Sequence, residues 1–284
     1  MTKVKITKMQ GCGNDFVILP QEELSKIDMP MNEIAKKLCD RHFGIGADGL
    51  IIPNNNNILN TDIGWFFFNS DGSVAQMCGN GMRCFAKYVY NKRLVNSNKF
   101  TVSTLAGIIT PEILEDGRVR VNMSNPILEP EKIPFLPNHN LNYKISVKNR
   151  IFEGNAISMG NPHFVIFIKD NEDLLNLAKI YGAEIENSAE FPEKTNVEFI
   201  KIKSYKKIEL CVWERGCGIT LACGTGACAS VVAGILNGYL ENSVDVKLLG
   251  GTVNVVWNGT PNKSEGDVFL TGPAEFVFDT EIDI

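Results

Sequence analysis

Two segments of this 284-residue chain repeat one pattern. Residues 77–81 read Met-Cys-Gly-Asn-Gly and residues 222–226 read Ala-Cys-Gly-Thr-Gly, and an apolar periodic segment follows each. Upstream of them, Gly-Asn-Asp-Phe-Val-Ile at 13–18 recurs as Gly-Asn-Pro-His-Phe-Val-Ile at 160–166. Matched segments in the same order and at nearly one offset indicate a duplicated domain. We therefore expect two related halves, each with one cysteine at the same place in its fold.

A third pair of positions supports the duplication. Asn69 lies nine residues before Cys78, and Glu214 lies nine residues before Cys223; each follows a run that contains aromatic residues. A site at the junction of two such halves would face one substrate with equivalent groups from opposite sides.

The spacing of apolar residues after both cysteines predicts two helices, at i, i+3, i+4, i+7 and i+8. The second is apolar almost all round and is expected in the middle of its domain. Free amide groups and the positive helix end lower the pKa of a cysteine there and attract a carboxylate. Two activated thiols suggest proton transfer at a carbon next to a carboxylate. The periodic residues are Met82, Phe85, Ala86, Val89 and Tyr90, then Cys228, Val231, Val232, Ile235 and Leu236.

Short β-branched and aromatic runs make up most of the remaining chain. Because strands and helices do not alternate strictly, an α+β fold is favoured over a doubly wound parallel sheet. The expected strands are 4–9, 16–19, 65–68, 100–103, 119–123, 164–168, 197–202, 208–213, 253–257 and 276–278, with further helices at 32–39 and 172–181.

Composition excludes several classes of protein. The net charge is −5, from 28 basic and 33 acidic residues. No dense basic block accompanies it, which argues against a nucleic-acid partner. The start lacks the apolar core of a signal peptide, and no apolar run is long enough for a membrane span, so we expect a cytoplasmic protein without membrane contact. The eight cysteines include no Cys-x-x-Cys pair, so neither a disulfide framework nor a metal site is expected. Apart from Cys78 and Cys223, they should be small buried hydrophobes.

Seven ordered motifs together resemble the diaminopimelate epimerases, and the likeness runs nearly end to end. It implies two pseudo-symmetric domains, each a curved β-sheet or barrel wrapped around a central α-helix. The expected domains are residues 1–124, completed by a C-terminal strand at 272–284, and residues 125–271, with a proline-rich seam between them. The motifs are Gly-Cys-Gly-Asn-Asp-Phe at 11–16, Asp-Arg-His-Phe-Gly-Ile-Gly-Ala-Asp-Gly at 40–49, Phe-Asn-Ser-Asp-Gly at 68–72, Met-Cys-Gly-Asn-Gly at 77–81, Gly-Asn-Pro-His at 160–163, Trp-Glu-Arg-Gly at 213–216 and Ala-Cys-Gly-Thr-Gly-Ala at 222–227.

The resemblance implies a homodimeric, pyridoxal-independent enzyme without a cofactor. It would interconvert LL- and meso-diaminopimelate on the route to lysine and peptidoglycan. One of Cys78 and Cys223 would act as thiolate base and the other as thiol acid, and His163 and Glu214 would tune their pKa values. Gly49 stands where some relatives carry Gln. The implied substrate-binding residues are Asn14, Asn69, Gly79, Asn80, Asn161, Asn196, Glu214, Arg215, Gly224 and Thr225.

Other functions remain open at this point. A proline racemase or hydroxyproline epimerase also uses paired cysteines, but it typically has His where this chain has Asn80, and its monocarboxylate substrate gives Arg215 less to bind. Phenazine-type isomerases share the fold without the cysteine pair. A thiol redox sensor would place two cysteines together without needing Glu214 or Arg215.

Overall fold

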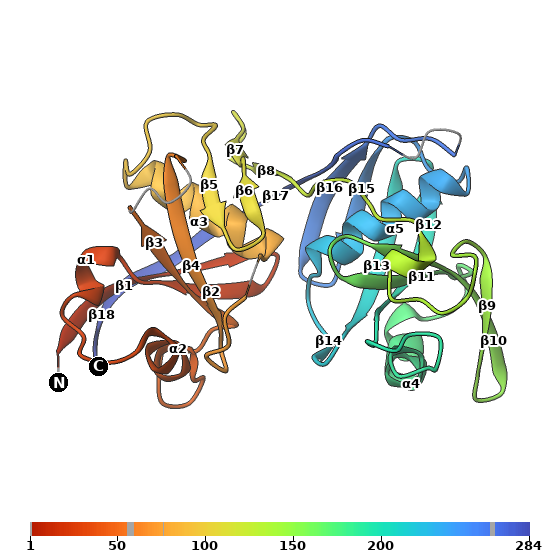
Figure 1. Cartoon of the computed structure of the whole chain (residues 1–284), viewed down its shortest axis with the longest axis horizontal. Coiled ribbons are helices and arrows are strands. Elements are labelled where there is room, and N and C mark those ends of the chain that lie inside the picture. Colours follow the sequence, from red (N-terminus) through yellow and green to blue (C-terminus); the bar gives the residue numbers. More distant parts are fainter. Residues whose placement is uncertain (1, 56–59, 76, 262–264) are drawn as a thin grey trace. The chain divides into compact units, whose positions relative to one another are not determined.

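The computed structural model describes residues 2–55, 60–75, 77–261 and 265–284. The chain forms two compact units (Figure 1). Unit 1 contains Met1–Val121 together with Thr271–Ile284, and unit 2 contains Asn122–Leu270. Unit 1 is therefore built from both ends of the chain. Within the described ranges, no helix has the length and apolar character needed to span a membrane.

Among its described residues, unit 1 has a mixed β-sheet and three helices. Its strands are β1 (Lys3–Gly11), β2 (Asn14–Ile18), β3 (Gly49–Asn54), β4 (Ile63–Asn69), β5 (Val102–Thr104), β6 (Gly107–Ile109), β7 (Glu112–Ile113), β8 (Val119–Asn122) and β18 (Glu275–Asp283), and its helices are α1 (Gln21–Leu24), α2 (Met31–Cys39) and α3 (Gly79–Asn91). The main sheet has the order β18-β1-β2-β3-β4-β5-β6, and β7 and β8 form an antiparallel pair. The last strand of the chain is thus paired antiparallel with the first.

Unit 2 repeats this plan. Its elements are η1 (Pro130–Lys132), β9 (Tyr143–Val147), β10 (Arg150–Ser158), β11 (Pro162–Phe167), α4 (Leu174–Glu186), β12 (Asn196–Ser204), β13 (Lys207–Glu214), β14 (Gly218–Ile219), α5 (Gly224–Leu236), β15 (Ser243–Leu248), β16 (Gly251–Trp257) and β17 (Val268–Gly272), which runs past the unit boundary. The strand order is β17-β16-β15-β13-β12-β11-β10-β9, with β14 paired to β13.

The duplication predicted from sequence is confirmed by the topology. From β1 to β6, neighbouring strands pair antiparallel, parallel, antiparallel, parallel and antiparallel. The series β10, β11, β12, β13, β15 and β16 follows the same alternation. Helices α2 and α4 each follow the second strand of their series, and α3 and α5 each precede the fifth. The α+β class with a central helix in each half is therefore correct.

Each central helix packs against the inner face of its sheet (Figure 1). Helix α3 contacts β1, β2 and β3, and α5 contacts β10, β11, β12 and β16. Most of α5 is buried, as its apolar sequence predicts. A cysteine at the start of either helix is consequently held by the core of its own unit.

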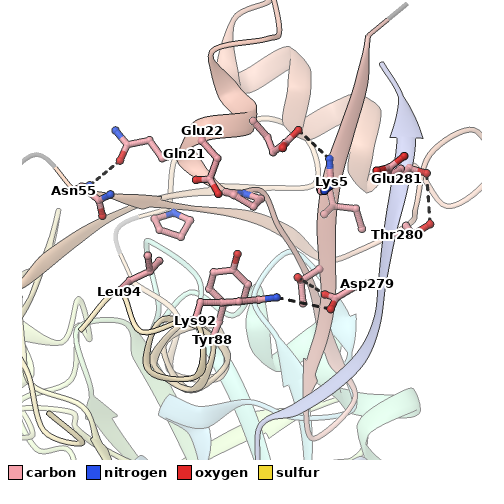
Figure 2. Close-up of a pocket in the computed structure, with 15 residues that line it drawn as sticks. Lys5, Gln21, Glu22, Asn55, Tyr88, Lys92, Leu94, Asp279, Thr280 and Glu281 are labelled. Atoms are coloured by element: carbon pink, nitrogen blue, oxygen red, sulfur yellow. Dashed lines mark hydrogen bonds and ion pairs between the residues drawn. The ribbon is translucent and has the colours of Figure 1, made fainter. Parts of the chain in front are cut away.

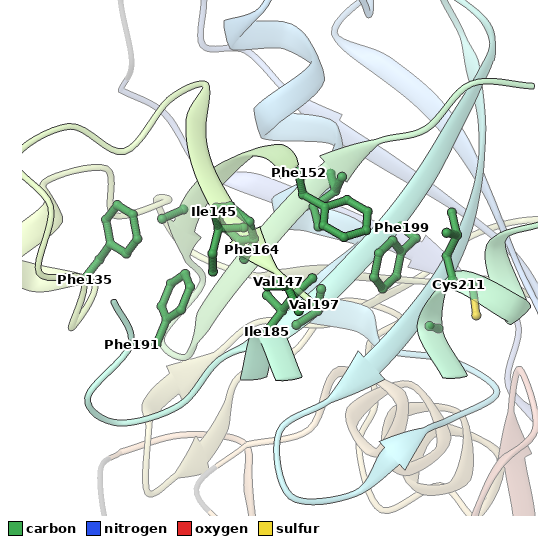
Figure 3. Close-up of a cluster of buried hydrophobic side chains, with 14 of the residues drawn as sticks. Phe135, Ile145, Val147, Phe152, Phe164, Ile185, Phe191, Val197, Phe199 and Cys211 are labelled. Atoms are coloured by element: carbon green, nitrogen blue, oxygen red, sulfur yellow. The ribbon is translucent and has the colours of Figure 1, made fainter. Parts of the chain in front are cut away.

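The outer face of the unit 2 sheet carries a second apolar cluster, under α4 (Figure 3). Ile185 on α4 packs into it with Phe164 and Phe199 from β11 and β12. Burying an aromatic or branched side chain contributes about 1.5–3 kcal/mol. Strands β11 and β12, which carry His163 and Asn196, are thus packed between α5 and α4.

Candidate active site

Both predicted cysteines are N-cap residues. Cys78 directly precedes α3 with an extended backbone, and its sulfur accepts a hydrogen bond from the Gly81 amide at 3.4 Å. Cys223 precedes α5 in the same way and accepts from the Gly226 amide at 3.3 Å. The first amides of a helix have no partner within it. Each unit therefore offers one thiol beside the positive end of a helix, which is a half-site for an anionic group.

The half-site of unit 1 joins Cys78 to two predicted residues. The Asn14 carbonyl oxygen lies 3.7 Å from the Cys78 sulfur and accepts a hydrogen bond from the Asn80 amide at 3.2 Å. Gly79 is the first residue of α3. Asn69, at the end of β4, donates instead to the Ser73 hydroxyl at 2.9 Å.

A buried cation supports this half-site and was not foreseen. Arg83 lies on α3 and is fully buried. Its guanidinium donates to the carbonyl of Gly79 at 3.4 Å and to that of Pro273 at 3.0 Å. It thereby ties the first turn of α3 to the C-terminal segment. The only sequence signal was a lone arginine among the apolar residues of a predicted helix.

A pocket of about 500 Å³ in unit 1 is separate from these groups (Figure 2). Tyr88 and Lys92, at the far end of α3 from Cys78, line it with Asp279 of β18. Figure 2 shows the Lys92 ammonium reaching toward the Asp279 carboxylate, 3.8 Å away. None of the predicted site residues lines this pocket.

The half-site of unit 2 has a matching asparagine. The Asn161 amide donates to the Thr225 hydroxyl at 3.3 Å, and that hydroxyl lies 3.5 Å from the Cys223 sulfur. The Asn161 carbonyl oxygen lies 3.0 Å from Nε2 of His163. Asn161 thus contacts Thr225 at the start of α5, as Asn14 contacts Asn80 at the start of α3, although Asn161 donates its hydrogen bond and Asn14 accepts.

Behind His163 lies a carboxylate that sequence reasoning missed. Glu198 on β12 is fully buried, and its Oε1 lies 2.7 Å from Nδ1 of His163, which is also fully buried. A Cβ added at Gly226 would lie 2.7 Å from the same oxygen, so a larger residue at that position of α5 would displace the Glu198 carboxylate. The signal was an acidic residue between Val197 and Phe199 in a predicted buried strand.

Glu214, Arg215 and Asn196 meet where β13 ends. Glu214 accepts a short hydrogen bond from the Thr220 hydroxyl. Asn196 donates to the Pro162 carbonyl at 2.8 Å and accepts from the Arg215 amide at 2.9 Å, so its side chain holds this segment against the start of β11. The Arg215 guanidinium donates to the Glu193 carbonyl at 3.0 Å.

The expected lowering of the thiol pKa is wrong for Cys223. Burial raises the pKa of Cys223 well above that of an ordinary cysteine, and the negative charges of Glu214 and Glu198 add to the effect. The Thr225 hydroxyl and the Gly226 amide oppose this increase without overcoming it. Burial likewise raises the pKa of the Glu214 carboxyl. Cys223 therefore holds its proton as a thiol, because loss of solvent outweighs the helix terminus.

Glu214→Gln should lower the pKa of the Cys223 thiol. At the alkaline pH where a thiol titrates, the Glu214 carboxyl is ionised, so the substitution removes a repelling negative charge. We expect alkylation of Cys223 by iodoacetamide, followed by peptide mapping, to begin at lower pH than in the parent protein. Glu209→Gln, at a half-buried position of the same strand where the carboxylate pairs with Lys247, is the control. An unchanged profile would show that Glu214 does not tune this thiol.

The remaining cysteines are buried with one exception. Cys217 is exposed, so its predicted burial is wrong; it lies in the turn between β13 and β14. No disulfide joins any of the eight cysteines. Among residues that the structure describes, no group of three or more potential ligands could hold a metal ion.

Comparison with known proteins decides which family carries these two half-sites. The sequence pattern that defines the diaminopimelate epimerases matches residues 6–129 and 155–277. The diaminopimelate epimerase of Halothermothrix orenii is 46% identical over 99% of this chain and 98% of its own length. The chain belongs to the diaminopimelate epimerase family. A second diaminopimelate epimerase, from Desulforapulum autotrophicum, is also 46% identical, over 99% of this chain and all of its own length.

A more distant likeness shows the fold alone. The crystal structure of a hydroxyproline epimerase from Agrobacterium vitis has a TM-score of 0.68 and 10% identity, and the match covers 99% of this chain and 92% of the other.

The diaminopimelate epimerase family is a family of isomerases, and the fold class expected for it is the one observed.

Proposed function

We propose that this chain interconverts LL- and meso-2,6-diaminopimelate, with Cys78 and Cys223 as the two proton-transfer groups. The observation that carries the proposal is the placement of one thiol at the start of the central helix in each unit, in a chain 46% identical to a diaminopimelate epimerase along nearly its whole length. The reaction belongs to the biosynthesis of lysine and peptidoglycan precursors, and we assign the protein to the cytoplasm.

Proton NMR in deuterium oxide tests this activity. We expect deuterium from solvent to replace the α-hydrogen of diaminopimelate, without added pyridoxal phosphate, as inversion proceeds. Proline is the matched control, because a proline racemase would exchange it and this chain should not. Exchange into proline alone would refute the proposal, and exchange into neither amino acid would favour a redox role for the cysteines.

The proposed step removes a proton from one face of the α-carbon and adds a proton to its opposite face. An α-hydrogen is a very weak acid, so the charge that develops must be stabilised as it forms. The Cys78 thiolate takes the hydrogen: the carbon–hydrogen bond breaks as a sulfur–hydrogen bond forms. The Cys223 thiol then gives its proton to the opposite face, and the centre is inverted. The raised pKa of Cys223 supports its assignment as the acid at the start, and the reverse reaction exchanges the two roles.

Substrate recognition divides between the two ends of diaminopimelate. The amides of Gly79, Asn80, Gly224 and Thr225, in the first turns of α3 and α5, would bind the reacting carboxylate. Asn14, Asn69 and Asn161 would surround the reacting centre. At the far end, the Arg215 guanidinium would bind the distal carboxylate and Glu214 the distal ammonium. His163 would tune the thiol pair through Asn161.

We also propose that the enzyme is a homodimer. Strand β18 is the edge of the unit 1 sheet and carries three consecutive exposed hydrophobic residues, Phe276, Val277 and Phe278. An exposed apolar edge strand favours pairing with another chain. We expect sedimentation equilibrium to give twice the chain mass of 31.4 kDa. The double substitution F276E/F278E should reduce it to the monomer; a monomeric parent protein would contradict the proposal.

A further inference from the structure

Asn14 is fixed in one orientation by an acidic residue outside the predicted site. Its amide nitrogen donates to the Asp48 carboxylate at 2.6 Å. Its carbonyl oxygen then faces the other way, 3.7 Å from the Cys78 sulfur and 3.2 Å from the Asn80 amide nitrogen. An ionised carboxylate accepts hydrogen bonds and donates none. The side of Asn14 that meets Asp48 must therefore be the amide group.

Asp48 is itself held on several sides. Its carboxylate accepts from the Arg41 guanidinium at 2.8 Å and from the Asp15 backbone amide at 3.1 Å. Arg41 also bonds Asp15, which in turn lies 2.7 Å from the Lys8 ammonium. Although burial opposes ionisation of Asp15, hydrogen bonds from Arg41 and Lys8 lower its pKa to about 2. Two cations, Lys8 and Arg41, thus lie against two carboxylates, Asp15 and Asp48.

We propose that Asp48 is a positioning residue for Cys78: it holds Asn14 with a hydrogen-bond acceptor, rather than a donor, toward the thiol. An acceptor there stabilises the protonated sulfur, and an amide donor would stabilise the thiolate. The inference rests on the proposed function and deepens it: once the Cys78 sulfur has taken the α-hydrogen, the Asn14 carbonyl oxygen accepts from that S–H group and stabilises the protonated form of the base. Asp48 lies just before β3, outside the set of residues expected to touch the ligand.

The related asparagine in unit 2 is held by a different group. Asn161 meets the His163 imidazole through its carbonyl oxygen and Thr225 through its amide. Asn14 meets Asp48 through its amide and Asn80 through its carbonyl oxygen. The two repeat-related side chains therefore turn opposite ends toward their helices. The residue behind each asparagine, rather than the asparagine itself, distinguishes the half-sites.

Removing Asp48 has two effects on Cys78 that an experiment must separate. Asp48→Asn lets Asn14 turn its amide toward the sulfur, and it also removes one negative charge nearby. Both changes lower the pKa of the Cys78 thiol. The charged groups around this half-site are Lys8 on β1, Asp15 on β2, Arg41 from the segment after α2, and Arg83 on α3; the other thiols are Cys12 and Cys84.

A double-mutant cycle with Asn14→Ala separates the two effects, because only the loss of charge acts when Asn14 is absent. The measurement is the pH dependence of Cys78 alkylation by iodoacetamide, resolved by peptide mapping. We expect D48N to move the onset about one pH unit lower, the equivalent of one hydrogen bond to a charged group. On the N14A background the shift should fall to less than half. Asp62→Asn, an exposed carboxylate of unit 1 bonded to Thr101, should leave the profile unchanged.

Equal shifts on the two backgrounds, or no shift on either, would overturn the proposal. If D48N unfolds during the titration, Arg41→Met loosens the same carboxylate. Loss of this cation raises the pKa of the thiol on both backgrounds, so release of Asn14 should appear as an onset shifted less far upward with Asn14 present than with N14A. Alkylation needs no turnover, so its result is independent of the proposed activity. If diaminopimelate exchanges its α-hydrogen for deuterium but the D48N shift is the same with and without Asn14, this inference alone is refuted. If the D48N shift depends on Asn14 but no deuterium exchange occurs, the proposed function alone is refuted.

Discussion

Cys78→Ala and Cys223→Ala should each reduce the kcat for diaminopimelate inversion by at least about 10³-fold, within the range that a positioned acid or base contributes. Inversion needs both a group that removes the hydrogen and a group that returns one to the other face. Each variant retains only one of them. The measurement is the rate of conversion of LL- to meso-diaminopimelate by chiral chromatography.

Cys84→Ala and Cys228→Ala are the matched controls, because each removes a fully buried thiol from the same helix. They should act through packing, with a loss of about 1 kcal/mol in the free energy of unfolding and near-normal turnover of the folded protein. Substantial inversion by either Ala variant at Cys78 or Cys223 would contradict the two-thiol scheme.

Arg215→Met should lower kcat/KM for diaminopimelate by about 100-fold or more, which corresponds to about 3 kcal/mol of binding energy. Methionine keeps much of the side-chain volume and removes the guanidinium group, whose two parallel N–H donors bind a carboxylate. The backbone amide of residue 215 still donates to Asn196, so the chain around it should keep its path. Initial rates across a range of substrate concentrations provide the value.

Arg150→Met is the control for Arg215. Arg150 bonds Glu172 on the outer side of unit 2 and belongs to neither half-site. Its loss should leave kcat/KM within about twofold of the parent, because this half-buried ion pair has no contact with either half-site. If Arg215→Met behaved the same way, the distal carboxylate would have to be bound elsewhere.

Sequence periodicity was most reliable where local and tertiary preferences agree. The helices after Cys78 and Cys223 are present as predicted, because a periodic apolar face and a capping position both specify a helix start. Strand β3 was not predicted. It contains Gly49 and Pro53, which usually mark turns, yet it is buried throughout between β2 and β4. Its neighbours, rather than its own propensity, make it a strand.

The electrostatic character of the site was harder to predict than its members. Two thiols at helix starts look equivalent in sequence, and the helix terminus predicts a lowered pKa for both. Burial and the charges of Glu198 and Glu214 reverse that prediction at Cys223. Glu198 and Arg83 reach the half-sites from positions far along the chain or one helical turn away. Neither the tertiary contact of Glu198 nor the inward direction of the Arg83 side chain is marked by a spacing pattern in a single sequence.

The pairing of the first and last strands also orders the assembly of the protein on the ribosome. Unit 2 is encoded without interruption, so it can fold as soon as its strands emerge. Unit 1 is completed later: β1 acquires its β18 partner, and Arg83 and Lys87 on α3 acquire the carbonyl groups of Pro273 and Ala274, only after the segment that follows unit 2 has been made. A nascent chain that has completed unit 2, with Cys223, still lacks part of the structure around Cys78 in unit 1. A chain truncated before Pro273 would therefore lack the carbonyl groups that hold Arg83 and Lys87 on α3, the helix that Cys78 precedes. Residues 273–283 complete the hydrogen bonding that supports the first half-site.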